Sequence, residues 1–196
     1  RHGWGGSIFV GANYNDPVSV LILQSVRFSG CSGANPANGV ACATHGGAIF
    51  ALAESDVTVK DSTFEGTMAS SCGGAMYVHA LSIVKVQSCA FKQNTAGGLG
   101  GAIFITHQPS TGETSVQLLG GNNVFIQNSA GDKTSSIYKA DDGAVLFLDV
   151  CPPGTWQADD ATNHVSKVYN IDHDFIGCPY TCEANTSMAW YGSHKG

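Results

Sequence analysis

Pairs of acidic residues are the part of this sequence best suited to acid–base chemistry. Enzymes that cleave polysaccharides place two carboxylates across the scissile bond, or gather an acidic cluster for Ca²⁺ beside a basic residue. The acidic pairs here are Asp141 with Asp142, Asp159 with Asp160, and Asp172 with Asp174. All of them follow residue 140, and the only arginines are Arg1 and Arg27. We therefore predict that the chain is not an enzyme.

Histidines and acids near the C-terminus are the candidates for metal binding. The segment Asp172–Asp174 reads Asp-His-Asp and has His164 nearby, so it holds residue types that bind metal ions. A solvated loop is the alternative, and we favour it. We expect His45 and His79 in corners or walls of the fold and not as ligands. The glycine-rich segment Gly97–Ala102 lacks the lysine of a phosphate-binding loop. No metal and no cofactor is predicted.

Seven cysteines offer a different chemistry, disulfide formation. This number favours an oxidising compartment, and because it is odd, at least one cysteine is free or joined to another molecule. Cys31 and Cys42 bracket a long loop, and a bridge between them is the pairing that we expect first. For Cys89 two alternatives remain, a small buried hydrophobe or a bridge to Cys72.

The C-terminal part of the chain holds the remaining cysteines and one sequon. We expect Cys151 to pair with Cys178 or Cys182, between which the sequence does not choose. Asn185 begins the sequon Asn-Thr-Ser, which is typical of proteins secreted through a eukaryotic pathway. Together with the cysteine content, this predicts a secreted or cell-surface protein, glycosylated at Asn185.

Three glycine-rich pentapeptides define the elements that position these residues. GGAIF, GGAMY and GGAIF begin at Gly46, Gly73 and Gly100, in two steps of 27 residues. A fixed period in this range predicts a stack of repeated units. Apolar residues recur at equal offsets in the two full units, pairing Val57 with Val84, Val59 with Val86, and Phe64 with Phe91. Each unit thus holds three short apolar pieces, which are too short for helices and alternate as strands do.

The repeat predicts an all-β fold, a solenoid of about five coils of ~27 residues in which each coil is buried only by stacking on the next. Insertions are expected to project from the corners at Asn13–Pro17, Ser32–His45 and Gln108–Thr114. A weaker fifth unit begins at Ser135. Residues 1–150 are predicted to form the solenoid, and residues 151–196 an irregular, disulfide-tied C-terminal cap or connector.

Columns of like residues are expected to hold the coils together. The repeat core is predicted to contain two aromatic ladders, Phe9, Phe50, Tyr77 and Phe104 in one and Phe28, Phe64, Phe91 and Phe125 in the other. The glycine pairs at Gly46 and Gly47, Gly73 and Gly74, and Gly100 and Gly101 are expected to allow positive φ and close stacking at a corner. Asn94 and Asn128 are expected to form an amide ladder.

The GGAI and FxxN motifs resemble the repeats of the chlamydial polymorphic outer-membrane proteins and of large secreted proteins from algae and other protists. Phe91–Asn94 and Phe125–Asn128 match FxxN, whereas Phe64–Thr67 and Phe28–Cys31 depart at the last place. The resemblance covers about the first three quarters of the chain. It implies a right-handed, single-stranded parallel β-helix with an adhesive or surface-forming role. CPPGTW at Cys151–Trp156 resembles the short Cys-rich modules that follow such repeats in eukaryotic surface proteins.

Charge and the ends of the repeat bear on the partners. The net charge of −6 and the lack of a basic stripe argue against nucleic acid, and no apolar run approaches the ~18 residues of a membrane span. Only Arg1–Trp4 precede the first repeat, and Arg1 is expected to be a processed end or an internal cut. We therefore expect self-association, or a longer chain, to cover the N-terminal coil.

The sequence thus predicts an extracellular structural or adhesive protein. It would belong to a surface assembly or filament that is built by end-to-end or lateral contacts. The alternative is a carbohydrate-binding or polysaccharide-degrading module, with glycans as its partners and the long corner loops as its binding sites.

Overall fold

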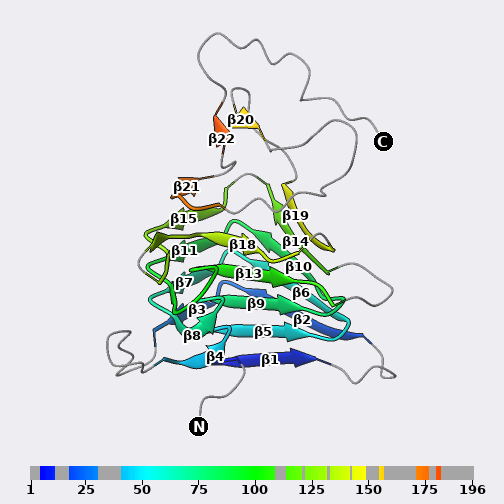
Figure 1. The fold of residues 1–196 in the computed structure, drawn as a ribbon. Coiled ribbons are helices and arrows are strands. Elements are labelled where there is room, and N and C mark those ends of the chain that lie inside the picture. Colours follow the sequence, from blue (N-terminus) through cyan, green and yellow to red (C-terminus); the bar gives the residue numbers. More distant parts are fainter. Residues whose placement is uncertain are drawn as a thin grey trace.

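The computed structural model of the chain describes residues 5–11, 18–30, 41–108, 114–120, 122–131, 133–141, 143–148, 155–156, 171–176 and 180–181. Within these ranges the chain forms strands and turns and no helix, as the sequence predicted. No described segment therefore has the helical length and apolarity that a membrane crossing requires. The strands lie one above another in a stack, which Figure 1 shows from the side.

Four sheets of five strands make up the stack, and we name each after its second strand. The β5 sheet contains β1 (Ile8–Gly11), β5 (Ile49–Leu52), β9 (Met76–His79), β13 (Ile103–Thr106) and β18 (Ile137–Lys139). The β6 sheet contains β2 (Ser19–Gln24), β6 (Ser55–Lys60), β10 (Ile83–Gln87), β14 (Thr114–Leu119) and β19 (Ala144–Leu148).

The other two sheets have shorter strands. The β7 sheet contains β3 (Arg27–Ser29), β7 (Thr63–Glu65), β11 (Ala90–Lys92), β15 (Val124–Ile126) and β21 (Phe175–Ile176). The β8 sheet contains β4 (Ala43–His45), β8 (Met68–Cys72), β12 (Thr95–Ala96), β16 (Ser129–Ala130) and β17 (Lys133–Thr134). A separate pair joins β20 (Thr155–Trp156) to β22 (Tyr180–Thr181).

The chain visits the four sheets in turn, and one passage through all four is called a circuit below. The second circuit runs β5, β6, β7, β8, and β9 then pairs with β5 in parallel. Val57 pairs with Val84 and Phe64 with Phe91, so neighbouring circuits are offset by the 27 residues of the repeat. Each circuit has four strands and not the three that the apolar pieces indicated. The fourth, β8, reads Met-Ala-Ser-Ser-Cys, and its polar residues hid it.

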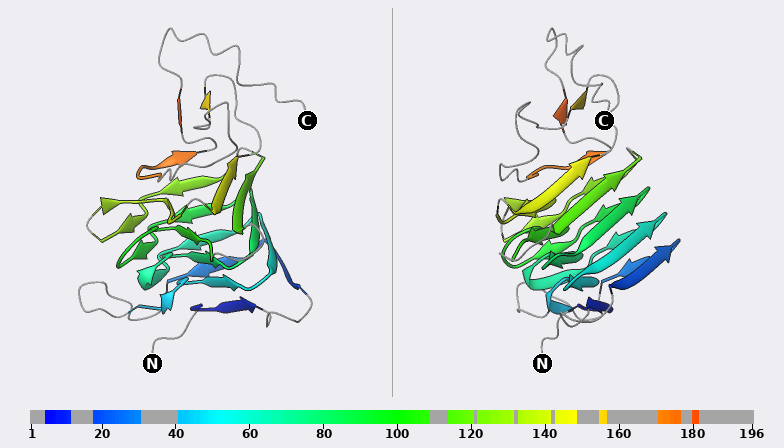
Figure 2. Two further views of the ribbon diagram at one scale, coloured as in Figure 1. Left: turned by 45° about the vertical axis from the view of Figure 1, so that its right-hand side comes forward. Right: turned by 90° about the vertical axis from the view of Figure 1, so that its right-hand side faces the viewer.

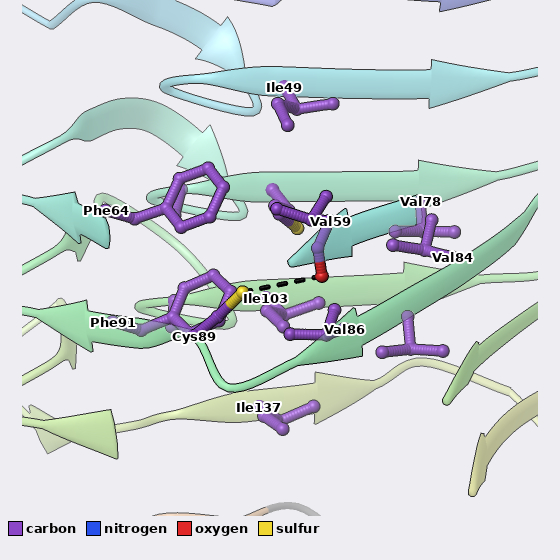
Figure 3. Close-up of a cluster of buried hydrophobic side chains, with 14 of the residues drawn as sticks. Ile49, Val59, Phe64, Val78, Val84, Val86, Cys89, Phe91, Ile103 and Ile137 are labelled. Carbon is purple, nitrogen blue, oxygen red and sulfur yellow. Dashed lines mark hydrogen bonds between the residues drawn. The ribbon is translucent and has the colours of Figure 1, made fainter. Parts of the chain in front are cut away.

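Alternation along the strands fills the space between the sheets with apolar side chains. Figure 3 shows Val59 above Val86, with Ile103 beside Val86 and with Phe64 and Phe91 to one side. Phe28, Phe64, Phe91, Phe125 and Phe175 stack with ring centroids 4.7, 4.7, 4.6 and 4.5 Å apart. This column continues through every circuit and is the centre of the core.

The second aromatic column lies on the other side of its sheet. Phe9, Phe50, Tyr77, Phe104 and Tyr138 stack with centroids 5.5, 4.9, 5.1 and 5.7 Å apart. The core cluster contains Ile49 and Ala51, so Phe50 between them faces away from it. We predicted this column as part of the repeat core, and Phe50 and Phe104 are indeed buried, but on the opposite face of the sheet from the core cluster, and Phe9 is 53% exposed. Because β5 is apolar on both faces, its sequence does not reveal which face is turned inward.

The two glycines of each corner divide the two expected roles, positive φ and close stacking, between them. Gly73 has a φ of 69°, in the left-handed region that side chains disfavour. Gly74 has no positive φ, but a Cβ there would overlap the carbonyl oxygen of Gly101 in the next circuit. The first glycine allows the turn, and the second allows the circuits to approach.

An amide ladder runs along another corner. Asn94 Nδ2 donates to Asn128 Oδ1 at 2.9 Å, and both side chains are fully buried. Thr67, at the equivalent place one circuit earlier, donates through Oγ1 to Asn94 Oδ1 at 2.7 Å. Thr67 therefore continues the ladder where the FxxN motif lacks its asparagine.

The predicted insertions are only partly within the described residues. Asn13–Pro17 lies outside them, as do most of Ser32–His45 and Gln108–Thr114. The end of the second insertion is not a loop, because Ala43–His45 forms β4 and Ala43 is fully buried against β8. Thr114 likewise begins β14.

Candidate functional site at the first circuit

Among the described residues, the first circuit lies at one end of the stack, and all four of its strands are edge strands. β1, β2, β3 and β4 each pair with one neighbour and have no second partner among the described residues. Figure 1 shows β1 and β4 at the lower end of the stack, and the right-hand view of Figure 2 shows β2 as the lowest strand of the β6 sheet. Edge strands present unpaired N–H and C=O groups, which can pair with another chain.

The backbone of β2 shows which residues carry these groups. The Ser25 N–H donates to the Lys60 carbonyl on β6 at 3.1 Å. Backbone direction alternates along a strand, so the odd-numbered residues of β2 bond to β6 and the even-numbered ones face away. The N–H and C=O groups of Val20, Ile22 and Gln24 therefore point to the open edge.

Exposed apolar side chains are concentrated in the same circuit. Val20 and Ile22 are 68% and 70% exposed on the outer face of β2, and Val18 beside them is 53% exposed. Phe9, also 53% exposed, ends the outer aromatic column with one ring face uncovered by the described residues. On the next strand, β6, the partners of Val20 and Ile22 are Asp56 and Thr58. The outer face is thus apolar at the edge strand and polar one strand further in.

Val20 and Ile22 were missed at the level of sequence, although the signal was present. The repeat places Leu21 and Leu23 in the columns of Val57 and Val59, and the structure pairs them so. The residues between must then face outward, and in β2 both are apolar. Reading the outward positions of each strand, as well as the inward ones, would have found them.

The opposite end of the stack is covered on three of its four sheets, while β19 of the β6 sheet has β14 as its one neighbour among the described residues. β21 pairs antiparallel with β15, and the Phe175 ring lies on Phe125 at 4.5 Å. The Gln127 N–H donates to Asp174 Oδ1 at 2.7 Å. Ile171 bridges to Ile137 on β18, and β17 turns back antiparallel on β16. The last strands of the β5, β7 and β8 sheets therefore all have antiparallel neighbours.

The acidic residues predicted as catalytic candidates have structural contacts where the structure describes them. Asp141 accepts hydrogen bonds from Thr106 Oγ1, the His107 N–H and the Ala144 N–H at 2.9, 2.8 and 3.0 Å. This carboxylate fixes the turn between β18 and β19. Asp172 and Asp174 are exposed at the covered end. Asp142, Asp159, Asp160 and His164 lie outside the described residues.

Metal-ligand geometry is not found in the described part of the chain. No group of three or more histidine, cysteine or acidic side chains gathers there in a form that could hold a metal ion. His173, between Asp172 and Asp174, is exposed, and its carbonyl accepts a hydrogen bond from Ser136 Oγ at 2.9 Å. In the described residues this segment covers the last circuit.

Two histidines flank Tyr77 in the outer aromatic column. The His45 ring packs edge-on against Tyr77 at 4.8 Å, and His79 lies 6.1 Å from the same ring. Burial lowers the pKa of His45. Burial also lowers the pKa of His79, which Asp141 raises in part and His107 and His45 lower further. Burial, with Cys72 and Asp141, raises the pKa of Tyr77 to about 12. These groups are therefore uncharged wall residues near neutral pH.

The cysteines resolve one of the alternatives left open by the sequence. Cys72 and Cys89 are free, so they do not form a bridge with each other. Cys89 is buried in the core, 3.2 Å from the Gln87 carbonyl oxygen, and burial raises the pKa of its thiol. Cys42 is disulfide-bonded, and neither of these two is its partner. The remaining predicted sites lie outside the described residues, namely Cys31, Cys151, Cys178, Cys182 and Asn185.

Comparisons with known proteins leave the chain without an assigned family. No family model matches it, and no curated protein or solved structure is detectably similar to it. The class that the structure defines is therefore structural, an all-β chain whose described residues form four stacked, largely parallel sheets.

Proposed function

We propose that the chain is a right-handed parallel β-helix and serves as an extracellular or cell-surface structural or adhesive module that acts through its first-circuit edge. The observation that carries the proposal is the difference between the two ends of the stack. Residues 171–176 pair with β15 and bridge to β18 at the last circuit, where β19 has one edge unpaired, whereas the first circuit has all four strand edges unpaired among the described residues. Exposed apolar side chains lie on that same circuit.

The physical argument is that an uncovered edge with apolar side chains favours association. Proteins that remain monomeric protect their edge strands with charge, proline or a covering segment. The sequence of β2, Ser-Val-Leu-Ile-Leu-Gln, contains neither charge nor proline. In a structural or adhesive module, an unprotected edge strand of this kind can serve as the binding surface for another chain. The oxidising compartment that the cysteine content favours supports an extracellular location.

A reducing-sugar release assay combined with a glycan array tests this function against polysaccharide degradation. The samples are the wild-type chain and Asp172→Asn, which removes an exposed carboxylate at the covered end. A structural role predicts no sugar release from either. Release by the wild type that is lost in Asp172→Asn would contradict the proposal. Glycan binding that Ile22→Lys leaves unchanged would place the contact away from the first circuit and would also count against it.

A further inference from the structure

We infer that the first-circuit edge binds a second copy of this chain head to head, with β2 of one copy pairing antiparallel with β2 of the other. The inference rests on the proposed function, because it names the partner at the same edge. It makes the assembly a closed dimer in place of the open filament that stacking of repeats would otherwise produce.

The far end of the stack obstructs the head-to-tail arrangement on three of its four sheets. A copy that stacked head to tail would offer its last circuit to the first circuit of its neighbour. Three of the four sheets at that last circuit already carry an antiparallel neighbour, β21 on β15, β17 on β16, and Ile171 on β18. Only β19 has no such neighbour among the described residues, and a copy that docked there would meet residues 171–176 at the neighbouring sheets. We therefore take the partner of the open edge to be the open edge of a second copy. Such a contact is isologous and closes after two copies.

β2 is the edge strand best suited to this contact. It has six residues, whereas β1 has four and β3 and β4 have three each. A two-fold axis does not superimpose all four edges of one circuit on those of another, but it can pass through the middle of a single strand. In an antiparallel pair of two β2 strands this axis lies at Leu21, so that Leu21 faces its own copy.

Backbone direction and side-chain direction agree on this register. With Leu21 at the axis, Val20 of one copy lies opposite Ile22 of the other. The N–H and C=O groups of both residues point to the open edge, so Val20 and Ile22 form hydrogen-bonded pairs that exchange two bonds each. A shift by one residue would bring an outward side chain against an inward one and would misdirect these groups.

The same register covers the exposed apolar side chains. Val20 and Ile22 both lie on the outer face, where they are 68% and 70% exposed. Across the axis they become neighbours with Cβ atoms ~5 Å apart, a distance at which β-branched side chains pack. The two-fold axis makes this contact twice. The only apolar pair on the outer face of β2 thus becomes self-complementary.

The first test is the mass of the 196-residue chain by light scattering over a range of concentrations. We expect a species of two chains that does not grow further as concentration rises. Ile22→Lys should abolish it, because two like charges would then flank the axis. Ser70→Lys, which puts the same charge at an exposed position of β8, should leave it intact. A wild-type chain that stays monomeric, or a mass that increases without limit, would overturn the inference.

A disulfide test reads the register directly. Cys72→Ser is the background for all samples, because Cys72 is a half-exposed free thiol. Val20→Cys chains mixed with Ile22→Cys chains should form a cross-linked dimer, since hydrogen-bonded antiparallel partners have Cα atoms ~5.5 Å apart, within disulfide range. Neither variant should form the cross-link by itself. In a dimer of one variant, the two introduced cysteines are diagonal neighbours across the strand pair, ~7–8 Å apart. Cross-links in the separate samples but not in the mixture would overturn the inference.

The outcomes separate this inference from the proposed function. A monomer, a filament or a different cross-link would refute the head-to-head dimer. The structural role at the edge would then still be tested by the sugar-release assay. Sugar release that depends on Asp172 removes the structural role whatever the mass of the chain.

Discussion

The two ends of the stack are made of similar circuits but end in different ways. At the first circuit every strand runs parallel to its neighbour, and the outer face of β2 is apolar. At the last circuit Ser135 and Ser136 replace the glycine pair, and a segment from far along the chain lies across the strands in the opposite direction. The aromatic core column ends under Phe175 on one side and at Phe28 on the other.

The difference shows that a repeat specifies stacking but not termination. Each circuit is a template for the next, because a parallel strand edge with matching columns always accepts another. Stopping the stack requires residues that break the pattern, and residues 171–176 do so with reversed strand direction and two apolar side chains, Ile171 and Phe175. Among the described residues nothing comparable lies on the first circuit.

Truncating the middle of the core column should have the largest effect on stability. Phe91 is fully buried between Phe64 and Phe125. Phe91→Ala should lower the free energy of unfolding by roughly 3–5 kcal/mol, the usual cost of a cavity of this size. Urea denaturation measures it. An unchanged midpoint would contradict the register that places this ring inside the stack.

Truncating the covered end should have the next largest effect. Phe175 is buried but stacks on one ring only, that of Phe125, so Phe175→Ala should cost about 2–3 kcal/mol, below the range for a central aromatic. It should also raise hydrogen exchange at β15, because β21 holds that edge. Exchange at β3, at the other end of the same sheet, is the internal control. Equal changes in β3 and β15 would mean that Phe175 does not act as a local cover.

Acid should weaken the wall that contains His45 and His79. The folded pKa values of both are lowered, so near and below the unfolded value of ~6.5 the unfolded chain binds more protons. Their contribution to stability is then fully present above pH ~6.5 and is lost as the pH falls through the lowered folded values. The measurement is the urea midpoint as a function of pH. His79→Gln should flatten the curve, and a curve of unchanged slope would exclude this residue as the cause.

The smallest effect is expected at the open end. Phe9 is half exposed and has Phe50 on one side, so Phe9→Ala should change the free energy of unfolding by less than ~1 kcal/mol. The change in the free energy of unfolding should be smaller for Phe9→Ala than for Phe175→Ala under the same conditions. The size of this difference measures how much more the last circuit is covered than the first. A loss as large as that of Phe175→Ala would show that the first circuit is covered after all.

Parts of the fold follow from the sequence because equal spacing leaves parallel strands little choice of partner. Val57 and Phe64 pair with the residues 27 positions later, as the offsets predicted. The outward side of the second aromatic column does not follow, because Ile49, Phe50 and Ala51 are all apolar and their alternation gives no signal. The strand β8 was hidden for the opposite reason, since most of its residues are polar or small.

The candidate site was predictable only in outline. The sequence predicted that self-association or a longer chain covers the first circuit, but Val20 and Ile22 were not recognised as its exposed residues. The covering of the last circuit by residues 171–176 had no periodic signal. It depends on a contact between segments about 50 residues apart, Phe125 and Phe175, which only the folded chain brings together.

The close approach at the second glycine of each corner has a consequence for the lengths that this chain can adopt. His45 and Cys72 occupy the same place in successive circuits, each directly before a glycine pair. Removing Gly46–Cys72 would join His45 to Gly73, so a glycine pair would still follow at this corner. The stack would become shorter by one whole circuit, and the circuits on either side of the deletion would stack directly on each other. Removing a single residue there would misalign four sheets at once. At this glycine corner the chain can therefore be shortened without misalignment only by a whole circuit.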